Sequence, residues 1–313
     1  MTDLPEIHPD MNRLLSIKSS VASDLDKDVL RQSSDQYASA FNRPYPPGML
    51  VENRKFKADN PERCIAMRIY RPVNRRSESS LVLYFHGGGF VKGDLDRSDT
   101  VAWGIAEQTC AIVVSIDYRL APEHPFPAAL EDGYAALQYL WDQGDQLQLQ
   151  RGRIAVWGDS AGGNIATAVC LLSRDRAGPP IVAQTIHYPC LTDQLTGESY
   201  VRFQNGPGLT TAAMDFYWDQ YLAYQRPAVN GYAAPLIASD LSGLPPAHVH
   251  IAEIDPLADD GRAYVSRLLE SGVTANLRTA TGMIHGFLRA RFDGEQAARE
   301  FDAPCKFVRQ FLA

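Results

Sequence analysis

The chain is poor in cysteine and lacks any long hydrophobic run. Its five cysteines are scattered, odd in number and without a Cys-x-x-Cys pair, which argues against a disulfide framework or a zinc site and fits a reducing compartment. The longest apolar runs, such as 81–85 and 111–114, are far too short to cross a bilayer. Because residues 1–15 also show no signal peptide, we expect a cytoplasmic protein with no membrane partner.

A surplus of positive charge is also absent. The formal net charge is −7, from 30 lysines and arginines against 37 aspartates and glutamates, which disfavours a polyanionic partner such as nucleic acid. Neither an internal repeat nor a low-complexity tract interrupts the 313 residues. With 45% hydrophobic and 21% charged residues, the composition is that of a globular protein with one large α/β domain or two smaller ones.

From about residue 50 onward, strand-like runs alternate with helix-like segments. Residues 53–58 and 65–70 have a period of two and predict a hairpin. Buried strands are predicted at 81–85, 111–116, 153–157, 182–188, 247–254 and 274–280. Helices are predicted between most of them, including Ala128–Gln143, Ala161–Arg174, Ala258–Ser271 and Glu295–Leu312. This alternation predicts a mostly parallel sheet covered on both faces, with ligands bound beyond the carboxyl ends of the strands.

Two regions break this alternation. Residues 10–40 are polar and compatible with a helix, and the turn cluster Asn42–Gly48 follows them. Residues 191–230 follow a predicted strand and become aromatic over 216–224. The aromatic stretch suits an ordinary helix packed on the core as well as a lid over a pocket, and the two alternatives are compatible.

The stretch Gly158–Gly162 places a serine between glycines immediately after the strand predicted at 153–157. A Gly-x-Ser-x-Gly sequence at a strand-to-helix turn is typical of a serine nucleophile held on a sharp, strained backbone. The helix that begins at Ala161 directs its N-terminus at the site, and this end favours developing negative charge. Because so short a pattern also arises by chance, Ser160 needs a base, an orienting acid and oxyanion donors elsewhere in the chain.

Seven histidines are candidates for the base, and one of them follows the last predicted strand. His285 lies in the turn Gly-Met-Ile-His-Gly-Phe, at the carboxyl edge of the sheet. The others lie in the polar N-terminal arm, at a glycine-rich loop, between prolines or within predicted strands: His8, His86, His124, His187, His248 and His250. His285 is therefore the predicted general base.

The orienting acid is expected at the end of another strand. Asp255 directly follows the strand predicted at 247–254, whereas Asp259 and Asp260 fall in the first turn of the next helix, where negative charge favours its N-terminus. A carboxylate at Asp255 accepts the imidazole N–H, fixes its tautomer and stabilises the imidazolium. The resulting chain order is that of α/β-hydrolases: Ser160, Asp255, His285.

A run of three glycines, His-Gly-Gly-Gly-Phe at 86–90, follows the strand predicted at 81–85. Consecutive glycines let backbone N–H groups approach a ligand without interference from side chains, although they also suit a flexible loop. Together with the N–H of Ala161, this loop is predicted to form an oxyanion hole.

In this combination the sequence resembles the hormone-sensitive-lipase-like carboxylesterases, microbial esterase family IV within the α/β-hydrolases. Five stretches carry the resemblance: HGGGF (86–90), DYRLAPEHPFPAALED (117–132), GDSAGGN (158–164), DPLADDG (255–261) and HGF (285–287). It implies an α/β-hydrolase fold with a mostly parallel eight-stranded sheet, helices on both faces and a helical cap. The catalytic domain is then expected at 51–313, and the cap at 1–50 with an insertion at about 191–230.

By its motifs, the resemblance implies a nucleophile, a general base that later acts as acid, and its carboxylate partner: Ser160, His285 and Asp255. It likewise implies three oxyanion donors, the N–H groups of Gly88, Gly89 and Ala161. His86 is expected to brace the glycine loop, and residues 117–132 are expected to support it rather than to react. The family works without a cofactor or a metal, and it includes homodimers as well as monomers.

The predicted function is a serine carboxylesterase that hydrolyses small-molecule esters of short to medium acyl chain through an acyl-serine intermediate. An amidase or lactonase with the same triad stays open, because the discriminating contacts lie in the pocket walls. A non-catalytic small-molecule receptor on the same fold is disfavoured because His285 is present. Four residues that adjoin the motifs are expected to line the pocket: Phe90, Asp159, Tyr188 and Phe287.

Overall fold

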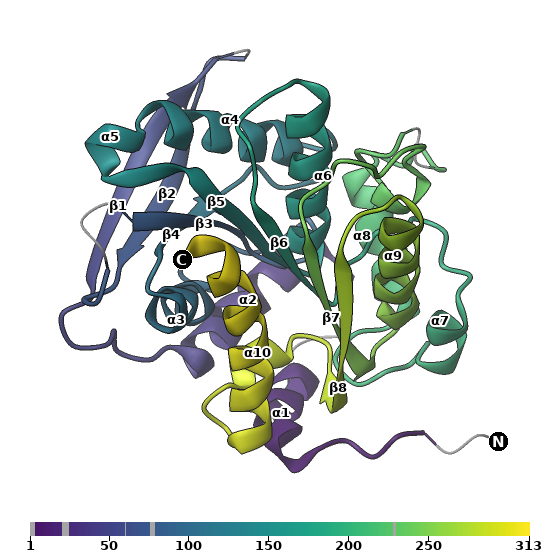
Figure 1. The fold of residues 1–313 in the computed structure, drawn as a ribbon. Coiled ribbons are helices and arrows are strands. Elements are labelled where there is room, and N and C mark those ends of the chain that lie inside the picture. Colours follow the sequence, from purple (N-terminus) through teal and green to yellow (C-terminus); the bar gives the residue numbers. More distant parts are fainter. Residues whose placement is uncertain (1–3, 21–24, 60, 76–78, 228–229) are drawn as a thin grey trace.

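An eight-stranded sheet crosses the molecule (Figure 1). The computed structural model describes residues 4–20, 25–59, 61–75, 79–227 and 230–313, and the sheet lies within them. Its strands follow the spatial order β1-β2-β4-β3-β5-β6-β7-β8. Their bounds are β1 Leu50–Ala58, β2 Arg63–Arg71, β3 Ser79–Phe85, β4 Ile112–Asp117, β5 Leu149–Asp159, β6 Ala183–His187, β7 Ala247–Ile254 and β8 Ala275–Ile284.

The sheet is antiparallel at one edge and parallel elsewhere. β1 and β2 form a hairpin, and β2 also pairs antiparallel with β4. The remaining pairs, from β4–β3 through β7–β8, are parallel. The structure thus confirms the predicted hairpin and the mostly parallel sheet.

The central strands are apolar along their length because both faces of the sheet are covered. On β3, Leu81, Leu83 and Phe85 belong to one buried cluster, while Val82 and Tyr84 belong to the other. Helices cover the first face (α4 Ala128–Asp142, α6 Ala161–Asp175, α9 Ala258–Glu270) and the second (α3 Asp99–Thr109, α10 Glu295–Leu312). The alternation of side chains between the two buried clusters and the helices on both sides together confirm the predicted layers.

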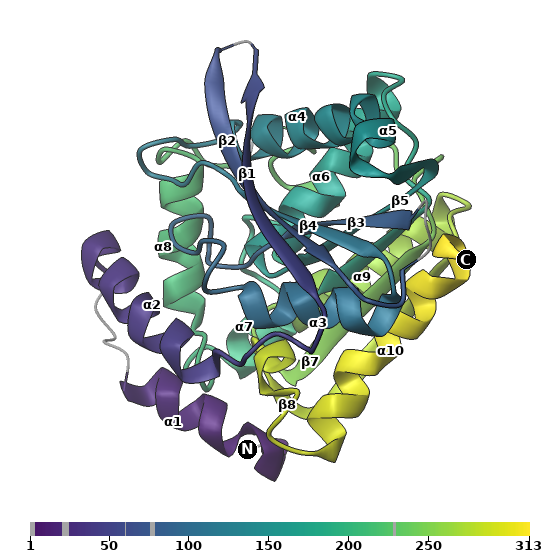
Figure 2. The same cartoon turned by 90° about the vertical axis from the view of Figure 1, so that its left-hand side faces the viewer.

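Further helices come from the N-terminal region and from the segment between β6 and β7. The first group is η1 Pro9–Met11, α1 Asn12–Ser20 and α2 Lys27–Phe41, and the second is α7 Glu198–Arg202 and α8 Thr211–Tyr221. Figure 2 shows α1, α2 and α8 on the same side of the molecule, and side chains of all three line one cavity. The helix-compatible stretch 10–40 therefore holds two helices, and residues 21–24 between them lie outside the described part. Within the described ranges, no helix is long and apolar enough to span a bilayer.

The aromatic residues of α8 have two different positions. Trp218 and Tyr221 are buried, and the ring of Phe90 stacks on Tyr221 with 3.8 Å between centroids. Tyr217 is buried as well, but it also lines a cavity described below. Packing on the core is therefore confirmed for Trp218 and Tyr221, and one face of the same helix remains available to a ligand.

Candidate active site

Ser160 lies on a sharp turn between β5 and α6. Its backbone is left-handed, with φ 56° and ψ −121°, a conformation that is strained for any residue with a Cβ atom. Space requires the flanking glycines: a Cβ on Gly158 would lie 2.1 Å from the Gly162 carbonyl oxygen, and one on Gly162 would lie 2.1 Å from that of Phe85. The turn therefore presents the serine hydroxyl at the carboxyl end of β5.

The structure brings the three predicted side chains together. His285 Nε2 lies 3.0 Å from Ser160 Oγ, and His285 Nδ1 lies 2.7 Å from Asp255 Oδ2. Asp255 follows β7 directly and is completely buried, and its Oδ1 accepts the N–H of Leu257 at 2.9 Å. His285 follows β8 directly, so the side chains meet from the carboxyl ends of three parallel strands. This arrangement suits transfer of a serine proton to an imidazole whose orientation a carboxylate fixes.

The glycine loop after β3 supplies backbone donors beside this serine. Gly88 and Gly89 have φ of +146° and +60°, and a Cβ on Gly89 would lie 2.5 Å from the ring of Tyr217. Ala161 is the first residue of α6, where N–H groups have no partner within the helix. Among the described residues, the N–H groups of Gly88, Gly89 and Ala161 have no hydrogen-bond acceptor. They are therefore available to an oxygen atom that develops negative charge next to Ser160.

Asp159 joins the serine turn to the glycine loop. Its Oδ1 accepts the Tyr84 hydroxyl at 2.7 Å and the Gly87 N–H at 3.1 Å, and Arg289 reaches its Oδ2 at 3.3 Å. Burial, assisted by the charge of Asp159, raises the pKa of Tyr84 well above its usual value, so the hydroxyl stays a donor. The sequence predicts Asp159 only as a pocket residue. Its contacts show that it also holds the glycine loop in place, which no local sequence pattern indicates.

His86 and the stretch 117–132 support the glycine loop from the protein interior. The His86 ring stacks on Tyr118 with 4.3 Å between centroids, and its Nδ1 lies 3.0 Å from the Gly87 carbonyl oxygen. The Tyr118 hydroxyl donates to the His86 carbonyl at 2.7 Å. Farther along, Arg119 forms a bidentate ion pair with the buried Asp132. These contacts agree with the supporting part expected for this stretch.

A cavity of about 390 Å³ opens at Ser160. Lys18 and Leu30 line it from the N-terminal helices, and Met214 and Tyr217 line it from α8. Its volume lies in the range of small-molecule sites, which usually measure about 300–1,000 Å³. The cavity therefore has room for a small substrate at the serine hydroxyl.

The four residues predicted to line the pocket divide into two pairs. Asp159 and Tyr188 lie on the cavity. For Phe90 and Phe287 the prediction is corrected to packing. The left-handed backbone of Phe90, with φ of 64°, directs its ring onto α8, and Phe287 is completely buried edge-on against Tyr188 and His250.

Lys18, which the sequence does not single out, reaches the cavity from α1. Its Nζ donates to the carbonyl oxygen of His285 at 2.6 Å. Burial lowers the pKa of Lys18 to about 7; the charge of Asp255 opposes this shift, and the charges of Arg289 and Lys92 add to it. No local pattern reveals this residue, because the two partners are 267 positions apart in the chain.

Asp259 and Asp260 do more than favour the N-terminus of α9. Asp260 is buried, and it accepts the Leu191 N–H at 2.7 Å and the Tyr200 hydroxyl at 3.1 Å. Asp259 accepts the Ser199 N–H at 2.8 Å. Burial raises the pKa of Asp260 to about 7. Both carboxyl groups thus hold the segment after β6 against the start of α9. The sequence does not predict this anchoring.

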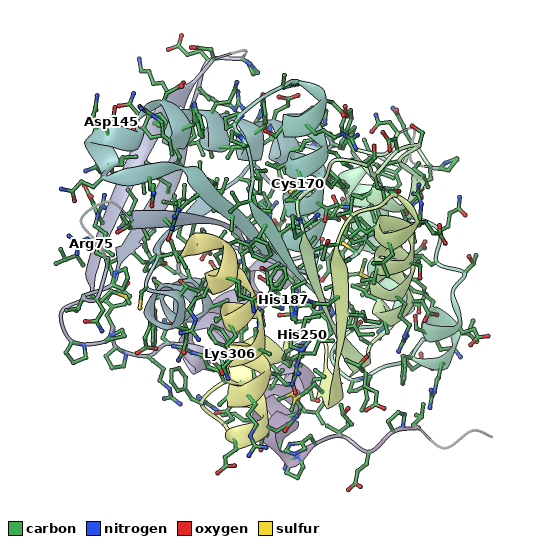
Figure 3. All side chains as sticks on the ribbon, viewed as in Figure 1. Arg75, Asp145, Cys170, His187, His250 and Lys306 are labelled. Carbon is green, nitrogen blue, oxygen red and sulfur yellow. The ribbon has the colours of Figure 1, made fainter. Side chains whose placement is uncertain are left out.

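Three further histidines lie buried in the sheet and do not line the cavity. His187 and His250 are labelled in Figure 3, on the neighbouring strands β6 and β7, with 5.6 Å between their ring centroids. Burial lowers the pKa of His187 and of His250, where Glu300 opposes the shift, and it lowers the pKa of His248 to about 3. All three therefore stay neutral near pH 7 and serve packing, as their strand positions predict.

We expect these buried histidines to make the fold sensitive to acid. The unfolded chain binds protons at histidine below about pH 6.5, whereas the folded protein does not, so stability is complete above this pH and falls below it. Each histidine contributes a slope of about 1.4 kcal/mol per pH unit. The free energy of unfolding in urea, measured at pH 6 and at pH 5, gives this slope. His187→Gln removes one of the three buried histidines, so we expect it to remove about one third of the slope that they contribute together.

The exposed His124 provides the matched control for that experiment. His124→Gln should leave the pH slope as in the unsubstituted protein. An unchanged slope in His187→Gln would mean that His187 takes up its proton without unfolding.

A second hollow, of about 470 Å³, lies near the end of α2 and lacks a comparable arrangement. Most of its charged groups are paired with one another: Arg68 with Asp96 and Asp99, and Arg97 with Asp94. Across the described ranges, no group of three or more His, Cys, Asp or Glu side chains is placed to hold a metal ion. The cavity at Ser160 is therefore the candidate active site.

The fold and this site together define an α/β-hydrolase whose serine, histidine and aspartate are arranged as in serine hydrolases. The model of the α/β-hydrolase fold family matches residues 82–289. The chain belongs to this family, and its resemblance to the hormone-sensitive-lipase-like esterases is confirmed.

Several known relatives are esterases by name. Esterase LipI of Mycobacterium tuberculosis is 42% identical over 236 residues, which are 74% of this chain and 73% of that protein. An arylesterase of Saccharolobus solfataricus is 36% identical over 244 residues, covering 78% of this chain and 79% of the relative. The solved structure of a hyperthermophilic esterase from Pyrobaculum calidifontis matches with a TM-score of 0.87 and 34% identity, over 97% of this chain and 98% of that one.

Proposed function

We propose that this protein is a serine carboxylesterase that hydrolyses small esters of short to medium acyl chain through an acyl-Ser160 intermediate. The observation that carries the proposal is the continuous contact from Ser160 through His285 to Asp255, over 3.0 Å and 2.7 Å, at the cavity. Membership of the α/β-hydrolase fold family and the esterase names of the relatives support the same class. The protein is accordingly a carboxylic ester hydrolase.

In the first half of the reaction, Ser160 Oγ attacks the ester carbonyl carbon while His285 Nε2 takes its proton. Asp255 accepts the Nδ1 hydrogen and stabilises the imidazolium. The carbonyl oxygen becomes an oxyanion, which accepts hydrogen bonds from the N–H groups of Gly88, Gly89 and Ala161. The carbon–oxygen bond to the alcohol then breaks, and His285 gives its proton to the leaving oxygen.

In the second half, a water molecule replaces the alcohol. His285 takes a proton from the water as it attacks the acyl-Ser160 carbonyl carbon, and the same backbone donors hold the oxyanion. When this intermediate collapses, the proton returns to Ser160 Oγ and the carboxylic acid leaves. No step consumes any reactant other than ester and water.

The same proposal assigns a cap to residues 1–50 and to the insertion at about 191–230, over a catalytic domain at 51–313. Side chains from both segments line the cavity, which supports this division. The N-terminal part is tied to the domain, because Arg31 of α2 donates to the Val91 carbonyl at 2.8 Å and pairs with Glu123 at 2.7 Å. Substrate contacts distant from the reacting carbon then come mainly from the cap.

The test is a series of p-nitrophenyl esters from acetate to laurate, measured as initial rates together with p-nitroacetanilide as the amide counterpart. We expect the rate to peak at a short or medium chain and to fall toward laurate, because the cavity of about 390 Å³ limits the acyl group. Turnover of the anilide faster than of the acetate ester would favour the amidase alternative. Folded protein that hydrolyses none of the esters would overturn the proposal.

A further inference from the structure

The cavity carries more positive than negative charge, although the chain as a whole is acidic. The described residues that line it include four basic side chains, those of Lys18, Lys92, Arg97 and Arg289, and one acidic side chain, that of Asp159. Because the net charge of −7 repels anions at long range, this local excess of basic groups needs a reason within the site.

Two of the four basic groups already have carboxylate partners. Arg289 lies 3.3 Å from Asp159, and Arg97 lies 3.3 Å from Asp94. Asp159, the one acidic side chain among the described residues of the lining, is therefore occupied, since it also accepts hydrogen bonds from Tyr84 and Gly87. The basic groups that remain are the two lysines, and a pKa of about 7 leaves Lys18 partly protonated near neutral pH.

Within the described part of the chain, no carboxylate lies at ion-pair distance from Lys18 or Lys92. Lys18 donates to two neutral oxygens, the carbonyls of His285 and Gly208. The Nζ of Lys92 lies 5.7 Å from the centroid of the Tyr217 ring, at the outer limit of a cation–π contact. Neither contact neutralises a charge.

The two lysines line the same cavity from different parts of the chain. Lys18 comes from α1, and Lys92 follows the glycine loop that begins after β3. Burial is the main reason that the pKa of Lys18 is lowered; Asp255 opposes the shift, and the positive charges of Arg289 and Lys92 add to it, so these positive groups act on one another. A cavity in which like charges repel is relieved when an anion binds between them.

We propose that the cavity selects esters that carry a second acidic group, a carboxylate, and that Lys92 and Lys18 bind this carboxylate. This inference rests on the ester hydrolysis proposed at Ser160. It makes the two lysines specificity residues, because they touch a distant part of the substrate and neither gives nor takes a proton in the reaction. The carboxylate belongs either to the acid or to the alcohol of the ester, and the experiment distinguishes the two.

The experiment compares each carboxylate ester with its neutral amide isostere by proton release at pH 7. Monomethyl adipate against methyl adipamate places the charge on the acyl side, and γ-acetoxybutyrate against γ-acetoxybutyramide places it on the alcohol side. We expect kcat/KM to be about tenfold higher for the carboxylate in one of the two pairs, as one charge-assisted contact provides. The pair that shows the preference locates the anion.

Variants then test the two lysines through the ratio of kcat/KM for the carboxylate ester to kcat/KM for its amide isostere. A general loss of activity lowers both values equally and leaves this ratio unchanged. Lys92→Met is expected to lower the ratio to about one, Lys18→Met to lower it in the same direction, and Lys92→Arg to keep most of it. Lys55→Met is the matched control, because Lys55 is an exposed lysine of β1, and it should keep the full ratio. High salt should reduce the preference, since it screens exposed charges.

The outcomes separate this inference from the proposed function. Hydrolysis of the neutral esters with a ratio of one or less in both pairs overturns the inference and leaves the esterase intact. A preference that survives both Lys92→Met and Lys18→Met overturns the assignment to these lysines. Absence of turnover with every ester, p-nitrophenyl acetate included, overturns the proposed function and this inference with it.

Discussion

Ser160→Ala is expected to lower kcat for p-nitrophenyl acetate by about 10⁶-fold, to the level of the uncatalysed reaction plus whatever the oxyanion donors contribute alone. The substitution removes the atom that forms the acyl bond and leaves His285 with nothing to activate. The fold should be unaffected, because Ser160 Oγ contacts His285 and alanine keeps the Cβ that already occupies the left-handed turn. Initial rates and urea midpoints on the same preparation measure both effects.

Ser266→Ala is the matched control for this experiment. Its hydroxyl donates to the Arg262 carbonyl within α9, on the exposed face of that helix, so the variant should keep full activity. Ester hydrolysis by Ser160→Ala within about tenfold of the unsubstituted protein would contradict the nucleophile assignment, given the 10⁶-fold loss expected for a serine hydrolase.

Asp255→Asn is expected to lower kcat by about 10⁴-fold with little change in KM, the size of effect seen when the acid of a serine-protease triad becomes an amide. The amide NH₂ cannot accept the Nδ1 hydrogen of His285, so the imidazole adopts the tautomer that has no lone pair toward Ser160. Rates and KM on one short-chain ester, together with far-UV circular dichroism, distinguish lost chemistry from lost fold.

Asp259→Asn is the comparison that makes this result specific. Asp259 follows Asp255 by four positions, but its carboxylate binds the Ser199 N–H and Arg262 rather than the histidine. We expect its rate to change by less than about threefold, because a partly exposed ion pair of this kind contributes little. If Asp259→Asn were the more damaging of the two, the wrong acid would have been assigned.

The sequence suffices to predict the parts of this site that lie at the ends of strands. Ser160, Asp255 and His285 each directly follow an apolar run, and parallel strands bring their carboxyl ends to one edge of the sheet. Their meeting is thus a consequence of topology, which the alternation of strands and helices indicates. For the same reason, the sequence distinguishes His285, which follows the last strand, from the histidines that lie inside strands.

The sequence is not sufficient for residues whose position depends on distant contacts. Phe90 and Phe287 both adjoin the sequence motifs of the site. The ring of Phe90 is directed by its left-handed backbone and by packing on α8, and the ring of Phe287 is directed by its contacts with the buried Tyr188 and His250. Lys18 lies on a polar helix where a lysine is ordinary. Only the folded chain places it on the carbonyl of a residue near the opposite end of the sequence.

Element bounds were also set by partners rather than by local composition. β8 continues to Ile284, beyond the predicted end at residue 280, although Thr281 and Gly282 interrupt the apolar pattern. Pairing with β7 resumes after an irregularity and includes Ile254 with Ile284. The Gly282 N–H donates to Glu253 at 2.7 Å, so a strand neighbour compensates for the weak local preference.

The crowding around the serine turn has a consequence for the gene as well as for the protein. Every missense mutation at a glycine codon introduces a Cβ atom, and at Gly158 and Gly162 that atom would lie 2.1 Å from a carbonyl oxygen. We therefore expect every amino-acid substitution at these two codons to disrupt the turn, and a mutant library should leave both codons unchanged. Leu30 and Met214 line the cavity from α2 and α8 rather than from the serine turn, so variation there is expected to alter which ester fits and to leave the turn in place.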